Sequence, residues 1–174
     1  FDNFAKAVET WNEDALERLM LIMRELPEKR TVAALFGLAL RFIPPIGGAD
    51  SRDADAMDRY KDKVKSFWAQ GWRGRVVAVW REWPDTVVSA GLAEAWERRK
   101  KIPERQEILL ATGEIKNPRG IRHAVPFLTQ GKEENCPLRA PAEAAVELVG
   151  RPAVPWLIGG LSDEQLMGPR LDTV

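Results

Sequence analysis

The chain contains few of the residues from which most metal and redox sites are built. Its 174 residues include one cysteine, Cys136, and one histidine, His123. A single cysteine excludes an internal disulfide and a cysteine-based zinc cluster, and it favours a reducing compartment, so we expect a cytoplasmic (intracellular) protein. A single histidine excludes di-iron centres built from several His-Glu pairs. We expect His123 to be a partly exposed residue at a helix start.

Charge is balanced, and no apolar run is long. The 26 basic and 26 acidic residues give a net charge of zero, so no global field attracts nucleic acid or an anionic membrane. Only residues 51–101 are basic, with twelve basic and eight acidic residues. The longest apolar run, Thr31–Leu40, is about half the length needed to cross a bilayer, so we expect a buried helix and no membrane partner.

Motifs for nucleophilic catalysis and phosphate binding are missing: the chain has no Gly-x-Ser-x-Gly and no glycine-rich phosphate loop. Asp53, Asp55, Asp58 and Asp62 include spacings that share a helix face, and divalent cations bind such oxygen clusters. Basic residues are interleaved with them, so a solvated, salt-bridged helix is the simpler interpretation. We therefore expect no enzyme, no cofactor and no metal.

Apolar residues recur at helical spacing along nearly the whole chain, and strand-like alternation is almost absent. The sequence therefore predicts an all-α fold with short proline and glycine turns. A break is expected at Gly71–Gly74, because two glycines there interrupt the helical pattern. The expected helices are about residues 4–26, 28–43, 53–70, 75–83 and 85–101, one opened by Pro103, one near Pro126, one opened by Pro141 and one opened by Pro155.

The helices are expected to group into three parts, which form either separate domains or one domain. Residues 1–48 would be an N-terminal helical pair, packed antiparallel and covered by the third helix. The middle helices, residues 49–101, are the basic part, and residues 102–174 would form stacked hairpins. The buried face of the first helix is predicted to comprise Leu16, Leu19, Met20, Met23 and Leu26.

A short segment occurs twice near the C-terminus. Ala124–Leu128 and Ala153–Leu157 both read Ala-Val-Pro-aromatic-Leu, at an offset of 29 residues. An alanine-rich helix and Gly150 precede the second copy, and Leu161-Ser162-Asp163 follows it. This order resembles the short HEAT-like repeat of phycobilin lyases, over about residues 107–163. The resemblance implies a short α-solenoid of antiparallel hairpins, in which Pro155 opens a helix and Ala153, Val154 and Leu157 face the core.

The first copy leaves two registers open. Either Pro126 opens a helix, or the helix begins at Pro118–Ile121 and Pro126 kinks it. The alternative to a repeat is two Ala-Val-Pro helix starts in an irregular helical domain.

Cations and tryptophans alternate in the middle third, and such residues neutralise phosphates and stack on bases. Against nucleic-acid binding stand the zero net charge and the fit of Trp68, Trp80 and Trp83 to inward-packing faces. A chain without catalytic motifs fits a non-enzymatic protein–protein interaction, scaffold or adaptor module, with another protein or a second copy as partner. Nucleic-acid binding is the alternative, and its expected patch is Lys61, Lys65, Trp72, Arg73, Arg75, Arg98, Arg99, Lys100 and Lys101.

Overall fold

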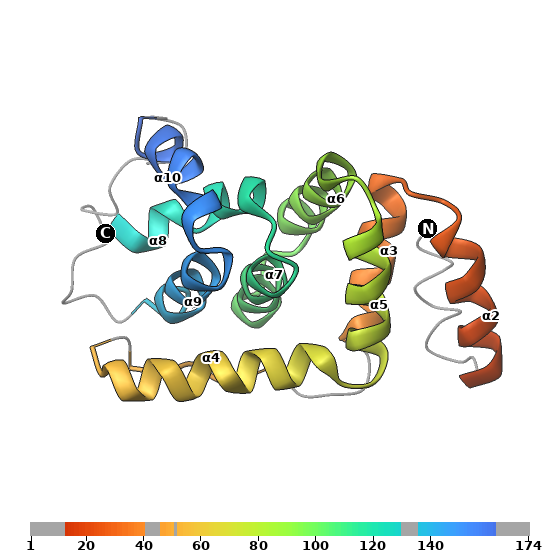
Figure 1. Ribbon diagram of the computed structural model, residues 1–174, viewed down its shortest axis with the longest axis horizontal. Helices are drawn as coiled ribbons and strands as arrows, with labels where there is room; N and C mark the ends of the chain where they lie inside the picture. Colours follow the sequence, from red (N-terminus) through yellow and green to blue (C-terminus); the bar gives the residue numbers. More distant parts are fainter. Residues whose placement is uncertain (1–12, 41–45, 51, 130–135, 163–174) are drawn as a thin grey trace.

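The computed structural model describes residues 13–40, 46–50, 52–129 and 136–162, and within these ranges it contains helices and turns but no strand (Figure 1). The predicted all-α fold is confirmed. None of the described helices is long and apolar enough to cross a membrane. The elements are α2 (Glu13–Arg24), α3 (Lys29–Ala39), α4 (Ala54–Ala69), α5 (Gly71–Glu82), α6 (Asp85–Arg98), α7 (Ile102–Glu114), the 3-10 turn η1 (Pro118–His123), α8 (Val125–Thr129), α9 (Arg139–Val149), the 3-10 turn η2 (Arg151–Ala153) and α10 (Val154–Leu161).

Helix α4 runs along one long side of the molecule, beneath α7 and α9 (Figure 1). Its N-terminus is capped by Asp53, whose side chain accepts a hydrogen bond of 3.1 Å from the backbone N–H of Ala56. One face, which carries Met57, Val64 and Trp68, is buried. The predicted helix over residues 53–70 is confirmed.

Helix α3 is apolar around most of its circumference, so it needs cover on several sides. It packs chiefly against α6 and α5, and Phe36 stacks on Trp68 and Trp80 at centroid distances of 6.3 and 6.5 Å. Helix α2 instead lies beside α5 at one end of the molecule (Figure 1). The main packing of α3 therefore differs from the expected antiparallel pair of the first two helices. The core is one cluster that includes residues from all three expected parts.

The expected break occurs at Gly71, where a φ of +54° turns the chain between the end of α4 at Ala69 and the start of α5. The next helix was expected to begin at Arg75, but it begins at Gly71. Gly74 lies inside α5, where a Cβ would be 2.4 Å from the carbonyl oxygen of Ala69, so this glycine allows two helix ends to approach closely. Leu26 was expected in the buried face of the first helix, but it follows the end of α2 and is 49% exposed.

The two Ala-Val-Pro copies have the same local structure. In each, a 3-10 turn leads into a helix whose second residue is proline, Pro126 in α8 and Pro155 in α10. Proline is favourable there because the first turn of a helix needs no hydrogen bond from its nitrogen. Pro126 therefore stands at a helix start and does not kink a longer helix. The HEAT-like resemblance itself stays a prediction.

The helices that precede the two copies, α7 and α9, pack directly on one another. In the second copy, Ala153 is buried and Leu157 is partly buried. The prediction for Val154 is wrong: this residue was expected to face the core, but it is 50% exposed. No described element covers that side of α10.

Candidate binding surfaces

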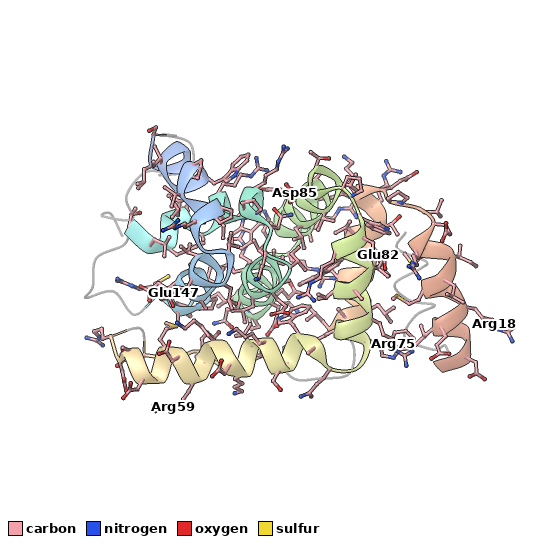
Figure 2. The ribbon with its side chains drawn as sticks, in the orientation of Figure 1. Arg18, Arg59, Arg75, Glu82, Asp85 and Glu147 are labelled. Atoms are coloured by element: carbon pink, nitrogen blue, oxygen red, sulfur yellow. The ribbon has the colours of Figure 1, made fainter. Side chains whose placement is uncertain are left out.

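The lysines of the expected cationic patch on α4 are paired with acids. Lys61 forms ion pairs with Asp58 and with Glu147 of α9, and Lys65 pairs with Asp62 at 3.6 Å. Figure 2 shows Glu147 on the side of α9 that faces α4. Two of the four interleaved aspartates thus neutralise lysines. Among the described residues, no group of three metal-ligating side chains is placed to hold a metal ion.

The patch residues of α5 divide between core and surface. Arg73 is 1% exposed, and its guanidinium lies 3.8 Å from the ring centroid of Phe67. Arg75 lies over the partly buried ring of Trp72 at 4.7 Å and pairs with Glu17 of α2 at 2.6 Å. The structure therefore places Arg73 inside the protein and engages Arg75 with a carboxylate.

The remaining patch residues lie at the junction of α6 and α7. Lys101, the N-cap of α7, is exposed. The other three form ion pairs with nearby glutamates: Arg98–Glu94 at 2.7 Å, Arg99–Glu104 at 3.0 Å and Lys100–Glu97 at 3.5 Å. The nine residues thus come from three helices and their junctions, and most of their charges are matched by acids. As a nucleic-acid surface they stay a prediction.

His123 lies at the end of η1, partly buried against an aromatic neighbour. Its ring stacks on Trp96 with centroids 5.2 Å apart, and Phe127 contacts the same indole at 6.0 Å. Burial, together with the positive charge of Arg122, lowers the pKa of His123 to about 4. The imidazole is therefore neutral near pH 7 and serves as a packing group. Cys136 is a free, partly buried thiol.

The buried carboxyl of Glu107 was not predicted from the sequence. Glu107 of α7 is 2% exposed, and its Oε1 accepts a hydrogen bond of 2.9 Å from the backbone N–H of Ile46. Burial raises its pKa to about 7, against the opposing effects of that hydrogen bond and of Arg73. Burial and the nearby Glu107 also raise the pKa of Tyr60. The one sign of this burial in the sequence is the position of Glu107 directly before the apolar run Ile108–Ala111.

A groove of about 350 Å³ runs between α2 and α5. Two ion pairs bridge it, Arg75–Glu17 at 2.6 Å and Arg24–Glu82 at 2.6 Å. Both pairs join residues 58 positions apart, so the two helices run parallel. Figure 2 shows Arg75 and Glu82 on the side of α5 that faces α2. The walls are mainly apolar between the pairs, with Met20, Leu21, Trp72, Ala78 and Val79.

Helix α10 presents a different surface at the other end of the molecule (Figure 1). All eight residues, Val154–Leu161, are uncharged, and the helix leaves three large apolar side chains exposed, Val154, Ile158 and Leu161. We call this surface the α10 face. Their spacing of four and three residues puts the three side chains on one stripe of the helix.

Comparison with known proteins gives no match: no family model, no curated protein and no solved structure is similar to this chain at a significant level. The α2–α5 groove has mainly apolar walls with Leu21 exposed on them, and the α10 face exposes three apolar side chains in one stripe.

Proposed function

We propose that the protein is a non-enzymatic adaptor that binds other proteins through apolar helix surfaces. The observation that supports this most is the presence of two such surfaces at opposite ends of the long axis, one on α2 and one on α10 (Figure 1). Exposed apolar side chains grouped in this way are characteristic of interaction sites, whereas single ones are ordinary. A molecule with two separated surfaces of this kind is suited to bring two partners together.

The α2–α5 groove accepts an amphipathic helix of a partner protein. Its apolar walls fit a ridge of side chains at helical spacing, in the way that many grooves between helices bind a third helix. Leu21, 65% exposed, lies on the rim, and Ile22 continues the apolar surface outside it. Because an ion pair stands at each end of the groove, charges of both signs are available to fix the orientation of the bound helix.

Nucleic-acid binding by the middle third is the second proposal, and it rests on exposed cations such as Lys101. Each cation that is paired with an acid must give up that pair before it neutralises a phosphate, which reduces the gain from binding. Six of the nine expected residues form such pairs, and Arg73 is buried. Protein binding is therefore the function we favour.

The test is affinity capture from a lysate of the native source, with the wild-type chain and a Leu21→Glu variant as baits, followed by quantitative mass spectrometry. A charge on the rim of the apolar groove should remove the partner, because it would be buried unpaired in the complex. Ala90→Glu is the matched control, since Ala90 is an exposed position of α6 outside the groove.

The expected result is a protein retained by the wild type and by Ala90→Glu but lost from Leu21→Glu. Circular dichroism of both variants checks that the helices are intact. Identical protein sets on all three baits would contradict the proposal.

A further inference from the structure

A second pocket, of about 300 Å³, lies where the ends of α5 and α7 meet the starts of α6 and η1. Its wall combines basic, amide and aromatic side chains, unlike the mainly apolar wall of the α2–α5 groove. The two share no lining residue, and no residue of α10 takes part. Because small-molecule sites begin at about this volume, the pocket fits a small ligand.

Lys116 contributes a cation to this pocket at a position that normally belongs to glycine. It directly follows the C-cap of α7, and its φ is +55°, which side chains disfavour. Its backbone N–H donates to the carbonyl of Gly113 at 3.0 Å, and that of Asn117 donates to the carbonyl of Thr112 at 3.0 Å, the pattern in which helices end on glycine. Its ammonium group forms no ion pair with any described residue. A lysine costs stability here, so its charge needs a role of its own.

Asn117 and Arg81 add hydrogen-bond donors to the same wall. Asn117 is 3% exposed, and its Oδ1 accepts hydrogen bonds from Ser89 Oγ at 2.9 Å and from the backbone N–H of Gly120 at 3.1 Å. These bonds fix the amide, whose NH₂ group has no partner within the described part of the chain. Arg81 uses Nη2 to bind the carbonyl and the carboxylate of Glu114, at 3.0 and 2.8 Å, which leaves its Nε and Nη1 for a ligand.

The rest of the wall is mainly apolar, with one acid. Trp83 donates its indole N–H to the carbonyl of Arg24 at 3.1 Å, so its ring is left as apolar surface, next to Ile115. The acid, Asp85, pairs with Arg119 at 3.1 Å. One negative charge on a ligand is therefore matched by the lysine and the arginine, whereas a second one would be repelled by Asp85.

We propose that this pocket binds a small monocarboxylate that has an apolar body. Lys116, Arg81 and the amide of Asn117 hold the carboxylate, and Trp83 and Ile115 contact the body. Hydrogen bonds from charged donors are stronger than neutral ones, and the planar fork of arginine matches a carboxylate. This site goes beyond the proposed protein-binding function and does not depend on it, because the groove contributes none of these residues.

The experiment is an NMR titration of the isotope-labelled full chain with hydrocinnamate, a carboxylate on a phenyl-bearing body. Hydrocinnamamide, which has the same shape without the charge, and sulfate, a dianion, are the comparison ligands. We expect saturable shifts of the backbone amides of residues 115–117, with a dissociation constant on the order of 1 mM, which is typical of so small a ligand. Both comparison ligands should bind about 10-fold more weakly or not at all.

Three variants test the named contacts. Lys116→Gly removes the cation and introduces the residue that suits the positive φ, so it should weaken hydrocinnamate about 10-fold without endangering the fold. Asn117→Asp keeps an oxygen for Ser89 and Gly120 but replaces the NH₂ donor by a negative charge, so it should abolish binding. Lys63→Gln removes an exposed cation of α4 and is the control, which should bind like the wild type.

The absence of saturable shifts at up to about 10 mM hydrocinnamate would overturn the inference. Equal affinity of the wild type for hydrocinnamamide, or of Lys116→Gly for hydrocinnamate, would overturn it too, because the carboxylate would then have no cationic partner in this pocket. Tighter binding of sulfate than of hydrocinnamate would contradict the choice of a monocarboxylate. Shifts centred on Leu21 and Ala78 would show that the ligand occupies the α2–α5 groove instead. None of these results alters the capture experiment with Leu21→Glu.

Discussion

Gly113 and Ala145 bring the backbones of α7 and α9 into contact: a Cβ on Gly113 would lie 2.8 Å from the Cα of Ala145. Real Cβ atoms essentially never come so close, so glycine is required at this crossing. Alanines on α9 make the approach possible from the other side, because Ala142, Ala144 and Ala145 are all fully buried. Helices α7 and α9 are therefore joined through small residues, and this joint has no room for a larger side chain.

The first prediction concerns this joint. Overpacking a well-filled interior costs about 1–3 kcal/mol. The helix-propensity gain of alanine over glycine offsets about 1 kcal/mol of this, so Gly113→Ala should destabilise the protein by up to about 2 kcal/mol. Gly47→Ala is the control, because a Cβ there meets nothing within 4 Å. Urea unfolding followed by circular dichroism measures both, and a Gly113→Ala variant as stable as the wild type would contradict the packing.

The local pattern of the sequence determines helices well and their packing less well. The spacing of Met57, Tyr60, Val64 and Trp68 predicts α4, and these four residues are its buried face. Which helices cover the apolar α3 depends on contacts between residues far apart in the chain, such as Val32 against Gly91 of α6. Local periodicity contains no information about such partners.

A second prediction concerns the buried carboxyl of Glu107. Its pKa is about 7 in the folded protein, against 4.5 for a free glutamate. Between those pH values the folded state holds a proton that the unfolded chain releases, so the contribution of Glu107 to stability falls as pH rises from about 4.5 to about 7. Glu107→Gln removes this dependence and still accepts the hydrogen bond from Ile46. Relative to the wild type, the variant should gain up to about 3 kcal/mol between pH 4.5 and pH 8.

Unfolding free energies of the wild type and Glu107→Gln across that pH range provide the measurement. Glu25→Gln, at an exposed carboxyl directly after α2, is the control and should keep the wild-type profile. A constant difference between Glu107→Gln and the wild type at all pH values would show that Glu107 is not the titrating group.

A third prediction concerns His123, whose pKa of about 4 lies below the ordinary 6.5. The unfolded chain takes up a proton before the folded state does, so this group reduces stability as pH falls from about 6.5 to about 4. Because the chain has one histidine, its ring-proton NMR signal is unambiguous. We expect the ring-proton signal of the folded protein to titrate near pH 4. In the unfolded chain the pKa should return to about 6.5. Titration of the folded protein near 6.5 would contradict the burial of the ring against Trp96.

In the candidate sites, the sequence predicts the burial of the tryptophans but not the burial of Arg73. Trp68 and Trp80 are fully buried and Trp83 nearly so, as their helix positions predict. The burial of Arg73 was not predictable, because an arginine beside Trp72 has the same local pattern on a surface or in a core. Its position is set by Phe67 of α4, which comes into contact only after the chain turns at Gly71.

A fourth prediction addresses nucleic acid directly. The adaptor proposal predicts that single- and double-stranded oligonucleotides show no saturable binding at physiological salt. If the cations of the α6–α7 junction do bind phosphates, affinity at low salt should fall steeply as salt is added. The double variant Arg98→Glu with Lys101→Glu should then abolish binding. A fluorescence anisotropy titration at several salt concentrations measures both, and tight, salt-dependent binding lost in the double variant would favour the alternative.

Site-specific photocrosslinking in cells compares the two functions in one measurement. A photoreactive amino acid is placed at position Leu21, on the rim of the α2–α5 groove, or at position Lys65, an exposed cation of α4. The adaptor proposal predicts a discrete crosslinked protein from position Leu21 and no crosslinked nucleic acid from position Lys65. Crosslinking of nucleic acid at Lys65, with no protein attached at Leu21, would contradict it.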